Sequence, residues 1–153
     1  MREMDEYGLM LCKYQADLFE YSSKEMVPSR VFIKQFAYSF VAKRLDKKSF
    51  LYESIDIPKA YNEVIGGFRF TGSVVFEQPI IRWIGYIYRY ISYIYEKPTK
   101  KIYERIKPQE LYDLYDSYHA LDNELAIRRI LEAKDINFEI KPNLTLLRKI
   151  YKI

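Results

Sequence analysis

The sequence predicts a mainly α protein that folds as one helical domain over residues 1–153. Apolar residues recur every three or four positions through most of the chain, which is the period of an amphipathic helix. Glycine is scarce, at 5 residues in 153, and this argues against an architecture built on many turns and strands. No linker or internal repeat divides the chain, so we expect a single helical bundle.

The first third of the chain predicts two amphipathic helices. The first extends over about residues 7–22, where four residues share one face: Leu11, Tyr14, Leu18 and Tyr21. The second follows Ser29, which is placed to cap it, and extends without a break to about residue 48. Its wide apolar face and its basic last turn suit a helix packed on a core.

Residues 49–76 interrupt this pattern. A short helix is predicted after Pro58, and it ends at Gly66 and Gly67 because glycine is favoured just beyond a helix C-terminus. Residues 68–76 then alternate weakly between apolar and polar side chains. They predict either a minor β element or an ordered loop.

The centre of the predicted bundle is a helix over about residues 79–97, opened by Pro79. Its isoleucines form one row: Ile80, Ile84, Ile87, Ile91 and Ile94. The opposite side carries a narrow polar row: Arg82, Gly85, Arg89, Ser92 and Glu96. Tyrosines and Trp83 flank the polar row. A helix that is apolar around most of its circumference is typical of the buried centre of a bundle.

Three shorter helices and a tail complete the chain. We expect Thr99 to cap a basic helix, Pro108 to begin an acidic one, and Asp122 to cap the third. Residues 134–153 are interpreted as a C-terminal extension, with a minor strand or ordered loop at 136–140 and a last helix after it.

The chain carries few of the side chains that enzymes use. It has one cysteine and one histidine, which excludes a disulfide framework and a two-histidine metal site. Cys12 has only Lys13 beside it and is expected to be an inert thiol. His119, at a predicted helix end, either stabilises that helix end or acts as a general base without an evident partner. We therefore expect a protein that is not an enzyme and holds no cofactor and no metal.

The sequence also bears on location. The first twenty residues carry acidic side chains and lack the pattern of a secretory signal peptide. The longest apolar stretch, residues 79–95, is interrupted by Arg82 and Arg89, so it is not expected to span a membrane. We expect a cytoplasmic protein.

Charge is distributed in blocks although the net charge is only +4. Residues 97–107 carry five basic side chains and one acidic one, whereas residues 108–126 carry five acidic side chains and no basic one. Basic segments of this kind could contact phosphates, and a small nucleic-acid-binding regulator is the alternative function. Against it, the acidic block separates the basic segments, and no recognition-helix turn joins a pair of helices.

Arg89 has two interpretations. Buried in the bundle, it needs an acidic partner, and Asp17, Glu20 and Asp122 are the candidates. Exposed among tyrosines, it would anchor an interface. Because Ile87 lies at the middle of the isoleucine row, we expect Ile87→Ala to damage folding more than Arg89→Ala.

The 16 tyrosines favour a protein-binding function, since tyrosine suits half-buried surfaces and interfaces. The partner is either another protein or a second copy of the chain, as in a homo-oligomer. Six residues are the candidates for partner contact: Arg82, Tyr86, Arg89, Tyr93, Tyr118 and His119.

Three stretches, residues 14–36, 80–111 and 112–133, resemble a family of small bacterial antitoxin-like proteins encoded beside ADP-ribosyltransferase-like toxins. The matching pieces are Tyr14-Gln15 with Asp17-Leu18-Phe19, Ser22-Ser23, Trp83-Ile84-Gly85-Tyr86 with Tyr88-Arg89-Tyr90, and Tyr118-His119 with Leu121-Asp122. They cover somewhat over half of the chain. The resemblance implies an inhibitor of a co-encoded toxin and brings no catalytic residue with it.

Overall fold

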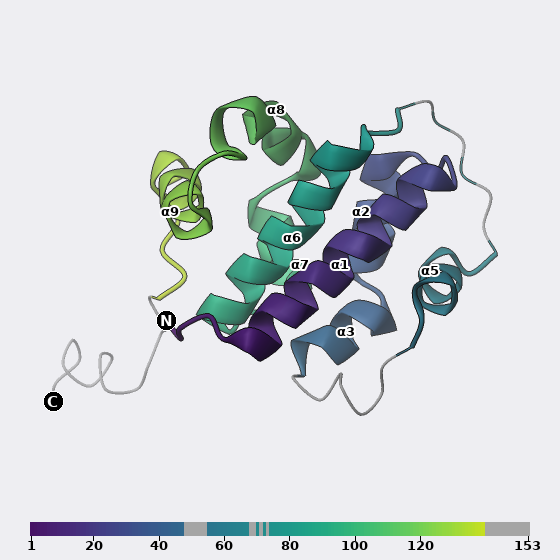
Figure 1. Cartoon of the computed structure of the whole chain (residues 1–153), viewed down its shortest axis with the longest axis horizontal. Helices are drawn as coiled ribbons and strands as arrows, with labels where there is room; N and C mark the ends of the chain where they lie inside the picture. The colour runs from purple at the N-terminus through teal and green to yellow at the C-terminus, as the bar shows by residue number, and fades with distance from the viewer. Residues whose placement is uncertain (48–54, 68–69, 71, 73, 140–153) are drawn as a thin grey trace, which may run out of the picture.

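In the computed structural model, helices are the only regular secondary structure of the described residues (Figure 1). The structure describes residues 1–47, 55–67, 70, 72 and 74–139. Within this part of the chain there are eight helices and no strand: α1 (Glu6–Lys24), α2 (Ser29–Ala37), α3 (Phe40–Asp46), α5 (Ile57–Ile65), α6 (Gln78–Tyr95), α7 (Thr99–Arg105), α8 (Pro108–Tyr118) and α9 (Asn123–Ala133). The predicted class, a mainly α bundle, is confirmed.

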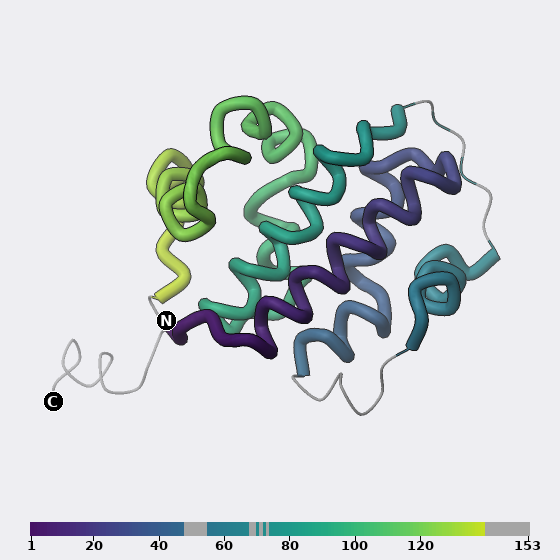
Figure 2. Tube along the Cα trace, in the orientation of Figure 1, coloured from purple at the N-terminus to yellow at the C-terminus, as the bar shows by residue number. Residues whose placement is uncertain are grey.

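The centre of the bundle is an antiparallel pair formed by α1 and α6 (Figures 1 and 2). At one end of the pair, the Arg2 backbone N–H donates to the Ile94 carbonyl at 2.8 Å. At the other end, the Ser23 hydroxyl donates to the Phe76 carbonyl at 2.9 Å. Helices α8 and α9 lie on one side of this pair and α5 lies on the other. The prediction of a central helix opened by Pro79 is confirmed.

The polar row of α6 lies toward α1, apart from the exposed Glu96 just beyond the end of the helix. Its Gly85 lies at the closest approach of the two helices, where an added Cβ would stand 2.8 Å from Phe19 Cγ and 3.0 Å from the Gln15 carbonyl oxygen. The isoleucine row packs into the core on the other side, so α6 is buried on two opposite faces. Glycine is needed here because any side chain would push the helices apart.

The single long helix predicted after Ser29 is wrong: it is divided into α2 and α3. Ser39 caps α3, with its Oγ accepting from the Ala42 N–H at 3.1 Å and donating to the Phe36 carbonyl at 2.7 Å. Ser29 is not a cap. It is the first residue of α2, and its Oγ accepts from the Phe76 N–H at 2.7 Å, which ties the loop before α6 to α2.

The glycine end of the helix predicted after Pro58 and the Asp122 cap are found where expected, whereas the Asp56 cap was not predicted. Asp56 caps α5, and Gly66 ends it in a left-handed conformation with φ of 61°. Asp122 caps α9 by accepting from the Leu125 N–H. Thr99 differs from the prediction because it is the first residue of α7 and its hydroxyl bonds elsewhere.

The predicted minor β elements are not found in the described residues. Residues 70, 72 and 74–76 have no strand pairing, and residues 136–139 contain only a turn at 138–139. Ile136 and Phe138 are buried, and the Phe138 ring lies 5.8 Å from that of Tyr95 on α6. The beginning of the expected C-terminal extension therefore belongs to the core. The last helix predicted there lies outside the described residues.

Candidate functional site

An open groove of about 310 Å³ lies between α1, α6 and α8. Its lining comes from all three helices: Ala16, Pro79, Arg82, Trp83, Tyr86, Tyr115 and His119. Three of the six residues predicted to contact a partner, Arg82, Tyr86 and His119, meet here although they come from two separate segments. Trp83 and Tyr115 complete the groove. The sequence pattern placed Trp83 beside the polar row of α6 but gave no sign that Tyr115 would reach it.

Arg82 is held in place by two carboxylates of α1. Its guanidinium donates to Asp17 Oδ1 and, at 3.1 Å, to Glu20 Oε2. The hydrogen bond to Asp17 is the main cause of a raised Arg82 pKa. Two of the acids proposed for Arg89 are thus the partners of Arg82 instead. The side chain is 37% exposed and lines the groove, so it remains available for contact there.

The aromatic side of the groove is a packed series of rings. Trp83 meets Tyr115 edge to face, with ring centroids 5.7 Å apart. Tyr115 stacks on His119, with centroids 4.1 Å apart, and His119 Nδ1 lies 2.7 Å from the Tyr115 carbonyl oxygen. His119 therefore packs at the C-terminal end of α8 with one ring nitrogen bound to the backbone. This contact agrees with a structural role of His119 at the helix end. The packed rings of Trp83, Tyr115 and His119 also form an ordered aromatic surface on the groove.

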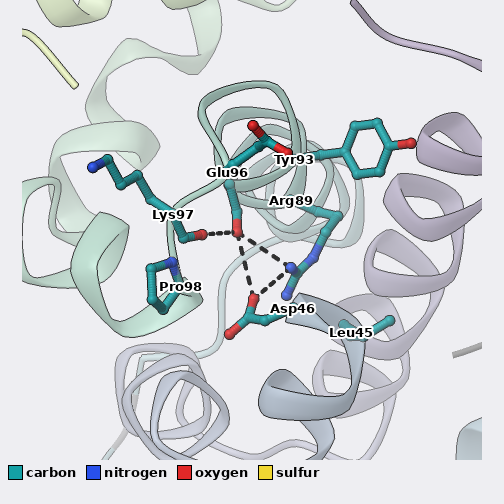
Figure 3. Close-up of a pocket in the computed structure, with 8 residues that line it drawn as sticks. Leu45, Asp46, Arg89, Tyr93, Glu96, Lys97 and Pro98 are labelled. Atoms are coloured by element: carbon teal, nitrogen blue, oxygen red, sulfur yellow. Dashed lines mark hydrogen bonds and ion pairs between the residues drawn. The ribbon is translucent and has the colours of Figure 1, made fainter. Parts of the chain in front are cut away.

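Arg89 lies inside the protein, at 1% exposure, and the prediction that a partner contacts it is corrected for this structure (Figure 3). Its Nε donates to Gln15 Oε1 at 2.8 Å, and its Nη1 donates to Asp46 Oδ1 at 2.7 Å. Its Nη2 donates to Thr99 Oγ1 at 2.6 Å. The acidic partner is Asp46, at the end of α3, and not one of the three acids that the sequence suggested.

Asp46 is as fully engaged as Arg89. It accepts from the Thr99 N–H at 3.1 Å and from the Thr99 hydroxyl at 2.7 Å, and Ser92 Oγ lies 3.4 Å from it. The cluster joins α1, α3, α6 and α7 beside a pocket of about 230 Å³ (Figure 3). Because the charged groups are paired with one another, this cluster stabilises the junction of four helices.

Tyr93 is also inside, at 4% exposure, so it too is removed from the predicted contact surface. Its hydroxyl donates to Asp5 Oδ1 at 2.7 Å, and the Arg2 guanidinium lies 4.2 Å from its ring centroid. Burial is the main cause, and the bond to Asp5 the second, of a Tyr93 pKa raised to about 12. Tyr118 is half-buried on α8 and is not among the residues that line the groove.

The described residues offer little reactive chemistry. Cys12 is fully buried, and burial raises the pKa of its thiol to about 12, so it stays protonated near neutral pH. Within the described part of the chain, no group of three or more His, Cys, Asp and Glu side chains is arranged to hold a metal ion. None of the described helices has the length and hydrophobicity needed to cross a membrane.

Comparison of the chain with family models, with curated proteins and with solved structures finds no match. The resemblance to antitoxin-like proteins therefore stays a prediction. The geometry of the groove is the firmest basis for a functional proposal.

Proposed function

We propose that this protein is a non-enzymatic binding module, an antitoxin-like inhibitor that restrains a toxin encoded beside it. The observation that carries the proposal is the meeting of Arg82, Tyr86 and His119 with Trp83 and Tyr115 in one open groove. Arginine, tyrosine and tryptophan are the residues most enriched at the energetic centres of protein interfaces. The resemblance suggests an ADP-ribosyltransferase-like toxin as the partner.

The shape of the groove favours a protein partner over a small substrate. It is open rather than enclosed, whereas small-molecule sites bury most of their ligand. Its side chains are already ordered, because Arg82 is bonded to α1 and the rings of Trp83, Tyr115 and His119 pack on one another. Such preorganisation reduces the entropy lost on binding.

The proposal is tested by expressing the chain with the product of the adjacent gene and measuring growth rescue and co-purification. Tyr86→Ala and Tyr115→Ala each remove a groove ring and should weaken binding by about 30-fold, the effect of losing an interface anchor worth about 2 kcal/mol. Tyr61→Ala is the matched control, because Tyr61 is a half-buried tyrosine of α5 outside the groove. Thermal unfolding of each variant establishes that it is folded.

Two results would overturn the proposal. If folded Tyr86→Ala and Tyr115→Ala bind the partner as tightly as the unaltered chain, the groove is not the interface. If His119→Ala abolishes rescue while the complex still co-purifies, the protein acts chemically on its target and is an enzyme. Cys12→Ala should rescue and bind normally, since its thiol is buried away from the groove.

A further inference from the structure

A second surface lies along α7 and has a different chemistry from the groove. Five cations stand on or beside this helix and form what we call the α7 strip: Lys97, Lys100, Lys101, Arg105 and Lys107. Lys97 is half-buried and the other four are exposed. None of the five forms an ion pair with any other described residue.

Some of the cations elsewhere on the described surface form ion pairs. Lys24 pairs with Glu20, Arg44 with Glu63, and Lys134 with Glu110. The α7 strip is distinguished by its density of charge, since residues 97–107 contain five cations and only Glu104 as an acid. Unpaired like charges on one short segment create a positive potential that attracts an anionic ligand.

One edge of the strip is hollowed. Lys97, Lys101 and Arg105 line a depression of about 410 Å³ together with Pro98, Glu104, Asn137 and Phe138. Lys101 and Arg105 are one helical turn apart and therefore lie on the same side of α7. The depression is large enough to take a phosphate group with the sugar attached to it.

Aromatic rings lie beside the other edge of the strip, at Tyr103 and at the junction of α2 and α3. Tyr103 lies edge to face with Tyr38, at 6.0 Å between centroids, and Lys107 Nζ lies 4.3 Å from the Tyr103 ring centroid. At the start of α3, Lys43 Nζ lies 5.0 Å from the ring centroid of Phe40. Tyr38 is 49% exposed and Phe40 is 73% exposed, which is unusual for large apolar rings.

Helical periodicity makes these two edges continuous. Positions along α7 rotate by about 100° per residue, so the face turned away from the buried Thr99 and Ile102 passes from Tyr103 through Lys100 to Lys101 and Arg105. Glu104 lies within this face, and the Tyr38 hydroxyl donates to it at 3.5 Å. Tyr103 therefore lies at one edge of this face and Lys101 and Arg105 lie at the other, with Lys100 and Glu104 between them.

We propose that the α7 strip binds single-stranded nucleic acid, with phosphates held by Lys97, Lys101 and Arg105 and bases stacked on Tyr38 and Phe40. Proteins that hold single strands combine a positive groove for the backbone with aromatic side chains for the bases. A duplex hides its base faces, so exposed rings favour a single strand. An acidic protein has no bases to stack on these rings, and competition with poly-glutamate tests for a partner of that kind.

The test uses the full chain and fluorescence anisotropy of labelled single-stranded RNA and DNA of about 12 nucleotides, a length within the range of single-strand binding sites. The logarithm of the binding constant should fall with the logarithm of salt concentration with a slope of about −2 to −3.5, because three to five phosphates are neutralised. A duplex of the same sequence should bind more weakly.

Two pairs of charge-reversal variants distinguish binding at the α7 strip from a general effect of the net charge of the protein. Lys101→Glu with Arg105→Glu should lower the affinity at least tenfold and flatten the salt slope. Lys13→Glu with Lys59→Glu makes the same change in net charge on exposed positions of α1 and α5, and it should change the affinity less than threefold. Tyr38→Ala with Phe40→Ala should lower the affinity without changing the salt slope, because stacking releases no counterions.

Several outcomes would overturn the inference. Absence of binding at low salt would do so, as would equal losses in the two charge variants. Tighter binding of the duplex would exclude single-strand recognition. Displacement of the oligonucleotide by an equal concentration of a nucleoside triphosphate would identify a free-nucleotide site, and equally tight binding of poly-glutamate would identify a general polyanion surface.

Discussion

Arg89 is the residue whose role depends most on its surroundings. Its three guanidinium nitrogens are all hydrogen-bonded inside the bundle, and its charge is paired with Asp46. Removing one member of a buried ion pair leaves the other charge buried without a partner. This lowers stability more than removing one member of an exposed ion pair does. The sequence-based expectation that Ile87→Ala is more damaging than Arg89→Ala is therefore revised.

We expect Arg89→Ala to lower the free energy of unfolding by about 3–5 kcal/mol. Ile87→Ala should lower it by a similar amount, because it leaves a cavity in the core. Arg82→Ala, which removes a half-exposed arginine, should cost about 1 kcal/mol or less. Urea unfolding of the three variants measures these differences. A cost for Arg89→Ala no greater than that for Arg82→Ala would contradict the assignment of a stabilising buried pair.

Cys12 provides a chemical test of the core. The thiolate is the reactive form, and burial raises the pKa of this thiol to about 12. The native protein should resist iodoacetamide near neutral pH for hours, and the unfolded protein in urea should be alkylated completely. Mass spectrometry before and after urea addition measures the extent of modification. Rapid alkylation of the native protein would show that α1 opens readily from α6.

At the scale of elements, the contact between α1 and α6 depends on Gly85. A methyl group there would lie 2.8 Å from the Phe19 ring and 3.0 Å from the Gln15 carbonyl oxygen, so one helix must shift. We expect Gly85→Ala to destabilise the protein by about 1–3 kcal/mol, although alanine favours a helix intrinsically. Ser117→Ala, at an exposed position in α8, is the control and should change stability little.

Thermal and urea unfolding measure both variants. If Gly85→Ala stabilises the protein by the amount that helix propensity alone predicts, the two helices are not in close contact at this position. A loss confined to Gly85→Ala supports the close packing of α1 on α6.

The break between α2 and α3 shows what periodicity misses. Apolar residues recur at helical spacing on both sides of residues 38–39, so the pattern predicts one continuous helix. The Ser39 hydroxyl competes with the backbone by bonding both Phe36 and Ala42, and this ends one helix and begins the next. The break changes the direction of the chain and brings Asp46 to Arg89.

At the scale of the whole molecule, the groove and the α7 strip lie on different elements. The groove is lined by α1, α6 and α8, whereas the proposed nucleic-acid surface consists of the α7 strip and the rings at the junction of α2 and α3. The two sets of residues have no member in common. The proposed protein partner and nucleic acid should therefore bind together without direct competition.

We predict that effects at the two surfaces are independent. Tyr86→Ala should lower the affinity for the protein partner and leave the affinity for the oligonucleotide unchanged. Lys101→Glu with Arg105→Glu should lower the affinity for the oligonucleotide and leave that for the protein partner unchanged. In the combined variant, the changes in binding free energy should add to within about 0.5 kcal/mol, as is usual for distant sites. Displacement of the oligonucleotide by the protein partner would show instead that one ligand covers both surfaces.

Those features of this protein that depend on neighbouring residues can be predicted from its sequence. Helical period predicts α1 and α6, and the chemistry of caps places Asp122 at the start of α9 and Gly66 at the end of α5. The sequence identifies Arg82, Tyr86 and His119 as candidates for partner contact. It does not predict that they lie in one groove.

Which helix faces meet depends on the packing of segments that are distant in the chain. Arg89 and Asp46 are 43 positions apart in the chain, so no local pattern could identify them as a pair. The same holds for Trp83 and Tyr115, whose contact depends on how α8 packs against α6. Local sequence determines where helices form because their hydrogen bonds join near neighbours, whereas partners and surfaces depend on packing between distant segments.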